Sequence, residues 1–373
     1  MRKHRRGFAK ALKYMACVLP VFWGSSCMDR LKETVEGKEN PVQDFKFWTW
    51  ITADASRTEA SYKEEFAKYK ENGFDAVLIN TEADPKLLER LAPLAIDQGL
   101  EVHAWMFTIN RPNDHVAREH PEWYAVSREG KSCYDHPPYV DYYQWMCPTR
   151  EGSRQHILNL VEGLARVDGI TSVHLDYIRY SDIFLPIGLL PKYNLKQEVE
   201  LPEYDFCYCE VCISEFEKIH HKSPLEAGNT AIDMEWKQFR LNKVKAIVDD
   251  AFKIAHSYDK ILTAAVFPYP EMADHMVRQR WDKWHIDAVL PMIYHNFYNE
   301  ELDWIGYATK QGVHDLEGKG VALHTGLFVP EMTADDLARA ISFARENGAA
   351  GVSLFDGPAI TSEQLAVVRN FQE

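Results

Sequence analysis

A short stretch near the middle of the chain, Ser172–Tyr180, places a carboxylate, a guanidinium and phenols at the end of an apolar strand pattern. If this strand alternates, Val173 and Leu175 face one side and Asp176 faces the other. A carboxylate in that position is costly unless it has a partner or a chemical task. Two interpretations follow: Asp176 forms a salt bridge with Arg179 that ends the strand, or Asp176 is a catalytic carboxylate.

The elements that would position Asp176 alternate between strand-like and helix-like segments from residue 45 onward. The expected strands cover 45–52, 74–80, 100–107, 172–178, 261–268, 286–294, 320–327 and 350–356. The expected helices cover 57–71, 85–98, 151–166, 232–257, 271–284, 300–310, 333–346 and 361–371. Thr333 and Thr361 suit helix N-caps, and Gly73, Gly99 and Gly348 lie just past helix ends. Eight strands, each followed by a helix, predict an α/β fold with a single (β/α)8 TIM barrel.

The rival architecture is a doubly wound open sheet, which requires a glycine-rich phosphate-binding turn after the first strand. Residues 52–55 read Thr-Ala-Asp-Ala and do not form such a turn. Two connections are long, 108–150 after strand three and 179–231 after strand four. Because long loops commonly act as lids or binding walls, both are expected to project over the carboxyl end of the barrel, where Asp176 lies.

A ring of aromatic and polar side chains is expected near the upper rim of this barrel. The residues expected to bind substrate are Trp50, Asn80, His103, Trp105, His174, Arg179, Tyr294 and His295. Lower layers of a barrel are usually aliphatic, so a ring of this composition indicates a site. Tryptophan faces can stack on sugar rings while polar neighbours bind hydroxyl groups, which favours a carbohydrate substrate.

Glycoside hydrolysis requires two carboxyl groups that flank the scissile bond. One donates a proton and the other attacks the sugar or activates water. Asp176 is the expected nucleophile or electrostatic stabiliser, kept ionised by Arg179. The second catalytic carboxylate is expected to be Glu82, at the end of strand two, or Asp356, at the end of strand eight. Glu271, after strand five, ranks behind them.

Metal-dependent hydrolysis is an alternative because His103, His174, His295 and His324 all fall near expected strand ends. However, the first strand carries no His-x-His pair, so no cofactor is expected. The net charge of −14 argues against nucleic acid as a partner. With 46% hydrophobic residues among 373, the chain can bury a large core.

The first residues have the pattern of a bacterial lipoprotein export signal. Basic residues precede an apolar run over 14–23, and small residues then lead to Cys27, the expected site of lipid attachment. The expected divisions are a signal peptide over 1–27, a tether over 28–44, and a barrel over 45–373 with an insert at about 179–231. The expected location is the cell envelope of a Gram-negative bacterium, at the outer membrane or cell surface, with the lipid as the only membrane anchor.

Five cysteines lie beyond the signal: Cys133, Cys147, Cys207, Cys209 and Cys212. The first two could close a loop as a disulfide in an oxidising compartment. The last three are spaced closely enough to hold a metal but lack a fourth ligand at a standard spacing, and His220 and His221 are the nearest candidates. The favoured interpretation is a disulfide among buried thiols, with a zinc site as the alternative.

Four stretches resemble the glycosyl hydrolase-like family 10 barrels, a group of exported bacterial proteins. They are 173–180 (VHLDYIRY), 263–268 (TAAVFP), 281–294 (WDKWHIDAVLPMIY) and 351–355 (GVSLF). The resemblance spans roughly residues 45–370 and implies a barrel that acts on glycans, including peptidoglycan strands stripped of their peptides. The alternative function is a non-catalytic glycan-binding lipoprotein that has kept the barrel and lost its acid/base partner.

Overall fold

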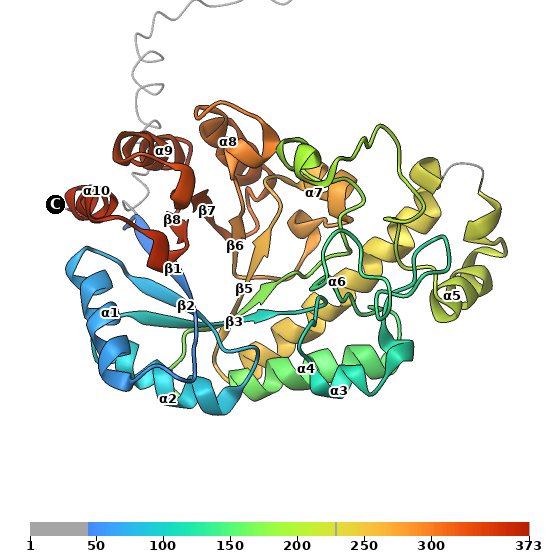
Figure 1. Cartoon of the computed structure of the whole chain (residues 1–373), viewed down its shortest axis with the longest axis horizontal. Coiled ribbons are helices and arrows are strands. Elements are labelled where there is room, and N and C mark those ends of the chain that lie inside the picture. Colours follow the sequence, from blue (N-terminus) through green and yellow to red (C-terminus); the bar gives the residue numbers. More distant parts are fainter. Residues whose placement is uncertain (1–43, 228–229, 373) are drawn as a thin grey trace, which may run out of the picture. The chain divides into compact units, whose positions relative to one another are not determined.

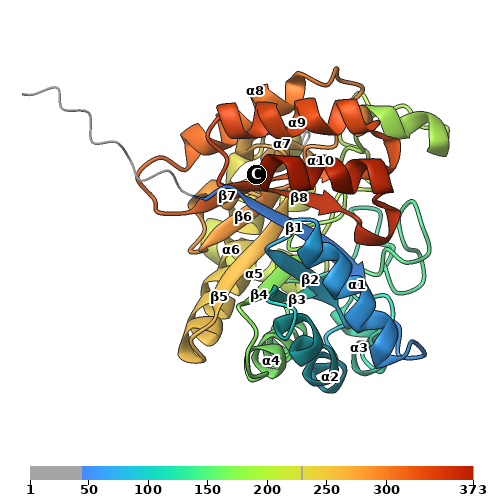
Figure 2. The same ribbon diagram turned by 90° about the vertical axis from the view of Figure 1, so that its left-hand side faces the viewer.

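The computed structural model describes residues 44–227 and 230–372. From Asp44 onward the chain forms one compact unit. Its centre is a closed barrel of eight parallel strands in chain order, surrounded by helices (Figures 1 and 2). The predicted (β/α)8 barrel is therefore confirmed and the open sheet is excluded. The expected signal peptide, Cys27, and all of the expected tether except Asp44 lie outside the described residues.

All eight expected strands are present, with ends that differ by a few residues. They are β1 (Lys46–Thr52), β2 (Ala76–Asn80), β3 (Glu101–Phe107), β4 (Ser172–Asp176), β5 (Ile261–Val266), β6 (Ala288–Pro291), β7 (Ala322–Phe328) and β8 (Gly351–Phe355). The barrel closes where Lys46 of β1 pairs in register with Gly351 of β8. Strand β6 is shorter than expected because Met292 forms only an isolated bridge with Gly326.

The expected helices are also present, and two begin with the predicted caps. The helices are α1 (Glu59–Glu71), α2 (Pro85–Ile96), α3 (His115–Arg118), α4 (Glu151–Ala165), α5 (Glu210–His220), α6 (Met234–Ser257), α7 (Pro270–Val277), α8 (Trp304–Asp315), α9 (Ala334–Glu346) and α10 (Ser362–Gln372). Thr333 forms a capping box with Asp336 at the start of α9, and the Thr361 hydroxyl accepts the Gln364 N–H before α10. Helix α7 ends early because Arg278 adopts a left-handed conformation. No helix among the described residues is long and apolar enough to cross a membrane.

Short 3-10 helices occupy several connections. They are η1 (Pro121–Trp123), η2 (Ile187–Tyr193), η3 (Pro224–Glu226), η4 (Thr230–Ile232), η5 (Trp281–Lys283), η6 (His295–Tyr298), η7 (Val329–Glu331) and η8 (Gly357–Ala359). The first lies in the long connection after β3, and the next three lie in the connection after β4. The last begins directly after Asp356 and therefore holds that residue at the carboxyl end of β8.

The barrel interior contains aromatic and polar side chains together with aliphatic ones such as Leu78 and Leu290. The Trp48 ring lies 3.9 Å from that of His324 and 4.2 Å from that of His103. The Ser172 hydroxyl lies 2.6 Å from His103 Nδ1, and both side chains are fully buried. Burial lowers the pKa of His103 and of His324 to about 3, so both rings are neutral near pH 7.

These buried rings correct the expectation that His103, His174 and His324 lie at the upper rim. His103 is only the third residue of β3 and pairs in register with Ser172, the first residue of β4. His174 is fully buried, and its Nδ1 lies 2.8 Å from the Thr263 hydroxyl. The inward orientation was predicted from alternation, but the depth depends on the stagger between strands.

The two long connections leave the barrel at the carboxyl ends of β3 and β4 and pack against each other. Ser127 and Phe206 form an isolated antiparallel bridge between them. The rings of Tyr139 and Tyr204 stack at 4.1 Å, and the Tyr139 hydroxyl donates to the carbonyl oxygen of Asp182 at 2.8 Å. Helix α5, in the second connection, lies away from the strands at the outer end of the molecule (Figure 1). The connections therefore form one joint wall.

Candidate active site

Asp176 is the last residue of β4 and pairs in register with Phe107, the last residue of β3. Its Oδ2 accepts a hydrogen bond from Trp105 Nε1 at 3.1 Å, and its Oδ1 accepts one from the Tyr177 N–H at 2.7 Å. Tyr177 has a φ of 50°, in the left-handed region that non-glycine residues rarely adopt. Such strain costs on the order of 1–3 kcal/mol and is concentrated at functional sites. The carboxylate is thus held by two donors at the mouth of the barrel.

Burial raises the pKa of Asp176 to about 6. The hydrogen bonds from the Tyr177 N–H and from Trp105, and the charge of Arg179, lower this pKa but do not cancel the effect of burial. The effect of Arg179 is the smallest of these. Asp176 can therefore hold a proton under mildly acidic conditions.

Arg179 does not have the role that the sequence suggested. Its Nη1 lies 3.1 Å from Asp182 Oδ2, and both side chains are buried. The guanidinium also lies 4.8–5.2 Å from the ring centres of Trp145, Tyr177 and Phe267. The interpretation of Asp176 and Arg179 as a salt bridge is wrong, because the ion-pair partner of Arg179 is Asp182. The charge of Arg179 lowers the pKa of Asp176, but it does not outweigh burial. At 5% exposure Arg179 instead supports the wall behind Tyr177.

Aromatic rings surround the Asp176 carboxylate. Trp50 and Trp105 meet edge-on with ring centres 4.9 Å apart, and Phe355 lies 6.0 and 6.2 Å from them. Phe107 meets Tyr177 edge-on with ring centres 4.8 Å apart, and its ring lies 5.9 Å from that of Trp105. Sequence reasoning found the two tryptophans but missed Phe107 and Tyr177. Phe107 had a signal, because it lies two residues beyond Trp105 on the same strand face.

The charges of Asp176 and Asp356 both act on the hydroxyl group of Tyr294. Burial has the largest effect on the pKa of the Tyr294 hydroxyl and raises it, and the charges of Asp176 and Asp356 raise it further. The Tyr294 hydroxyl is therefore within electrostatic reach of both carboxylates. The Tyr294 ring lies 6.3 Å from that of Phe355, the residue before Asp356.

Glu82 also lies near this mouth, but in a different environment. It is exposed, has a φ of 54°, and its Oε1 accepts a hydrogen bond from Asn113 Nδ2 at 3.2 Å. It lines a small pocket together with Asn80 and Phe107. The Asn80 side chain is 4% exposed and accepts the Glu82 N–H at 2.8 Å, so Asn80 shapes this turn. Glu271, in the first turn of α7, raises the pKa values of Tyr269 and Arg280, which lie outside the mouth around Asp176.

The four histidines considered for a metal do not form a shared ligand set. His295 begins η6, is half-buried, and lines an acidic depression with Glu331 and Asp336. Burial lowers the pKa of His295. Within the described residues, four cysteines are the sole group of His, Cys, Asp and Glu side chains close enough to share an ion. The arrangement at the mouth is therefore one of carboxylates and aromatic rings.

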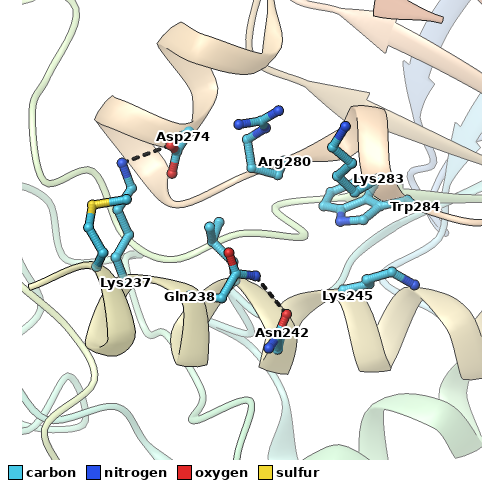
Figure 3. A pocket seen from close by; sticks show the side chains of 10 residues that line it. Lys237, Gln238, Asn242, Lys245, Asp274, Arg280, Lys283 and Trp284 are labelled. Atoms are coloured by element: carbon cyan, nitrogen blue, oxygen red, sulfur yellow. Dashed lines mark hydrogen bonds and ion pairs between the residues drawn. The ribbon is translucent and has the colours of Figure 1, made fainter. Parts of the chain in front are cut away.

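A groove on the outside of the barrel has a different character. It lies between α6 and the segment from α7 to η5, and has a volume of about 150 Å³ (Figure 3). Most of its charged residues are basic, and Lys237 forms an ion pair with Asp274 at 2.7 Å. The groove shares no residue with the mouth around Asp176.

Comparisons with known proteins support the fold. No family model and no curated protein sequence matches the chain. The PgaB (BpsB) glycoside hydrolase domain from Bordetella bronchiseptica has a similar structure, with a TM-score of 0.65 and 11% identity over 87% of this chain and 98% of that chain. The β-amylase catalytic domain from Paenibacillus polymyxa matches with a TM-score of 0.61 and 10% identity. This match covers 87% of this chain and 95% of that chain. A GH36 α-galactosidase from Geobacillus stearothermophilus, in complex with raffinose, matches with a TM-score of 0.50 and 10% identity. This match covers 87% of this chain and 40% of that chain. The chain shares its barrel fold with glycoside hydrolases.

Proposed function

We propose that this protein is a glycoside hydrolase whose reaction centres on Asp176. One observation carries the proposal: an inward-facing carboxylate ends β4, is held by Trp105 and the Tyr177 N–H, and lies within an aromatic mouth. In barrel enzymes catalytic groups collect at the carboxyl ends of strands. The similar solved structures include glycoside hydrolases, which supports the same reaction class.

In this proposal Asp176 acts as the general acid. A pKa of about 6 suits a group that must carry a proton to the leaving-group oxygen, whereas a nucleophile must be ionised at the working pH. As the glycosidic bond breaks, the proton of Asp176 moves to the departing oxygen. The Trp105 and Tyr177 N–H groups then stabilise the carboxylate that forms.

Asp356 is the proposed second carboxylate, which attacks the anomeric carbon or activates a water molecule. The charges of Asp356 and of Asp176 both raise the pKa of the Tyr294 hydroxyl, which supports a role for the two carboxyl groups in one site. Glu82 is the second candidate because it lines the adjoining pocket beside Phe107. Trp50, Trp105 and Tyr294 would then form the sugar-binding surface.

The proposed substrate is a polysaccharide, with peptidoglycan strands stripped of their peptides as one member of the class. The resemblance to glycosyl hydrolase-like family 10 and the aromatic composition of the mouth support it. A panel of glycans should be incubated with the purified protein and with Asp176→Asn, and new reducing ends counted. Activity that requires Asp176 supports the proposal. Binding of a glycan without any cleavage would instead favour the non-catalytic alternative.

We also propose export and lipid attachment at Cys27. The basic N-terminal residues, the apolar run over 14–23 and the small residues before Cys27 support this. Mass spectrometry of the membrane fraction should find an acylated N-terminal Cys27 in the mature protein. Cys27→Ala should release the protein from membranes. A mature N-terminus elsewhere, without lipid, would contradict the anchor.

A further inference from the structure

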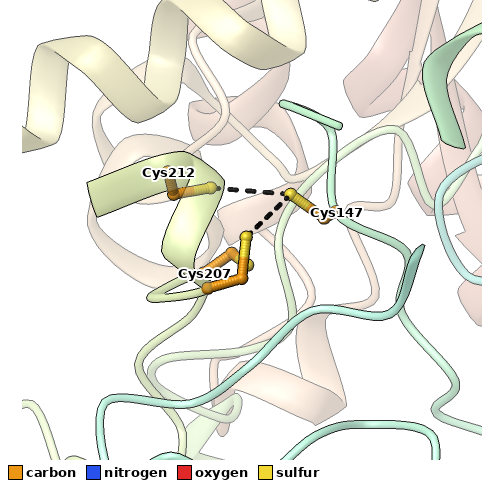
Figure 4. Close-up of side chains that lie close together, drawn as sticks. Cys147, Cys207 and Cys212 are labelled. Carbon is orange, nitrogen blue, oxygen red and sulfur yellow. Dashed lines mark hydrogen bonds between the residues drawn. The ribbon is translucent and has the colours of Figure 1, made fainter. Parts of the chain in front are cut away.

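Four cysteines from two segments that are distant in the sequence converge in the wall formed by the two long connections. Cys147 comes from the connection after β3, and Cys207, Cys209 and Cys212 come from the connection after β4. All four side chains are buried, and their sulfur atoms all lie within 4.8 Å of one another. Figure 4 shows Cys147 facing the side chains of Cys207 and Cys212. Cys147 is the fourth ligand that local spacing did not reveal.

The spacing of the sulfur atoms is that of a metal site rather than of disulfides. Cys147 Sγ lies 3.6 Å from Cys209 Sγ and 3.5 Å from Cys212 Sγ. A disulfide requires about 2.05 Å. A tetrahedral zinc ion with Zn–S bonds of about 2.3 Å separates its ligands by about 3.8 Å. The possible disulfide between Cys133 and Cys147 is not present, because both cysteines are free and Cys147 belongs to the cluster.

The surroundings of the cluster suit negatively charged sulfur. The Val126 N–H donates to Cys207 Sγ at 3.4 Å. Cys209 is the N-cap of α5, so the positive end of that helix faces the cluster. The N–H group and the helix end provide partial positive charge, which favours thiolate ligands of a metal.

We propose that Cys147, Cys207, Cys209 and Cys212 bind one structural zinc ion. A closed set of four cysteine ligands is a common structural zinc site, and zinc has no redox chemistry that the site would need to control. Binding releases the thiol protons and forms four Zn–S bonds, with no oxidant or reductant involved. The proposal goes beyond the proposed glycosidase activity and does not depend on it.

The cysteine site lies where the insert after β4 meets the connection after β3. Among its described residues, the insert after β4 contains α5 and short 3-10 helices but no strand, and α5 lies away from the barrel (Figure 1). Zinc would tie this insert to the connection after β3. Trp145, two residues before Cys147, lies 5.6 Å from the ring of Tyr177 and under Arg179. The metal site therefore anchors the wall that supports the residue beside Asp176.

The test is the metal content of the purified full chain, expressed with zinc in the growth medium and measured by elemental analysis. The expected result is about one zinc per chain in the wild type and in Cys133→Ser, which removes a buried cysteine outside the cluster. Cys147→Ser should lose most of the zinc. Wild type with little zinc and reactive thiols, with two disulfides, or with iron in place of zinc would overturn the proposal.

A second measurement covers the case in which Cys147→Ser fails to fold. Zinc is removed from the wild-type chain with a chelator and replaced by Co²⁺. A tetrahedral site with four thiolates should give intense sulfur-to-cobalt charge-transfer absorption together with visible bands. Cys133→Ser should give the same spectrum at the same stoichiometry. A spectrum typical of octahedral cobalt with oxygen ligands, or no bound cobalt, would contradict the assignment.

Discussion

The indole Nε1 of Trp105 donates a hydrogen bond to Oδ2 of Asp176 at 3.1 Å, across the adjacent strands β3 and β4. This contact favours the ionised carboxylate, whereas burial favours the protonated form, and the balance leaves a pKa of about 6. Trp105 is therefore positioned to tune the proton affinity of Asp176 as well as to contact a sugar.

Trp105→Phe should raise the pKa of Asp176 further, because it removes a hydrogen bond to the charged form. The alkaline limb of the pH–rate profile should then move to higher pH. Trp50→Phe is the matched control: it removes an indole from the same mouth, but Trp50 Nε1 has no hydrogen-bond partner within the described residues. An equal shift in both variants would show that the hydrogen bond does not set the pKa.

Asp176→Asn should become more stable relative to wild type as the pH rises. The folded protein holds the Asp176 proton up to a pKa of about 6, compared with 3.8 in the unfolded chain. Wild type therefore loses stability as the pH rises through this window, by up to about 3 kcal/mol. Loss of one acceptor costs the variant about 1 kcal/mol at every pH, so the pH trend is the informative quantity.

Urea unfolding of both proteins at about pH 5 and about pH 7 measures this trend. The free energy of unfolding of the variant minus that of wild type should increase by about 1 kcal/mol between these conditions. A difference that is independent of pH would show that Asp176 has an ordinary pKa, and would remove the support for a general acid.

The buried histidines should make the protein sensitive to acid. His103 and His324 have pKa values of about 3 in the folded state, compared with 6.5 in the unfolded chain. Their neutral form contributes stability that is fully present above about pH 6.5 and is lost as the pH falls toward 3. His324→Phe keeps a ring beside Trp48 and should reduce the slope of stability against pH by about 1.4 kcal/mol per pH unit. The exposed His314→Gln should leave the slope unchanged.

Asp356→Asn and Glu82→Gln should distinguish the two candidates for the second carboxylate. Loss of the nucleophile or base should lower kcat by about a hundredfold or more, since general base catalysis alone contributes about 10²–10⁴-fold. We expect this loss for Asp356→Asn and a change of only a few-fold for Glu82→Gln, which alters an exposed side chain paired with Asn113. The opposite order would assign the role to Glu82.

The sequence predicted the barrel because strand periodicity and helix caps are local signals. The alternation that turns Asp176, Trp50 and Trp105 inward is equally local. The depth of His103 was not predictable in this way, because it depends on the stagger between neighbouring strands. The partner of Arg179 was missed because two carboxylates, Asp176 and Asp182, lie three residues from it and chain geometry alone decides between them.

The cysteine cluster shows the same limit. Cys207, Cys209 and Cys212 are neighbours in the sequence and were recognised as a group. Cys147 lies 62 residues before Cys209, in a different connection. Only the packing of the two connections against each other, through pairs such as Ser127 with Phe206, brings it to the other three.

The central claim is that Asp176 donates the proton to the leaving group. Its most direct test compares wild type and Asp176→Asn on two substrates of the same sugar, the glycan found by screening and an aryl glycoside whose leaving group needs no proton. On the glycan the variant should lose about 10²–10⁴-fold in kcat/KM, whereas on the aryl glycoside cleavage of the bond should fall far less. Equal losses on both substrates, or full activity on the glycan, would contradict the role of Asp176 as the general acid.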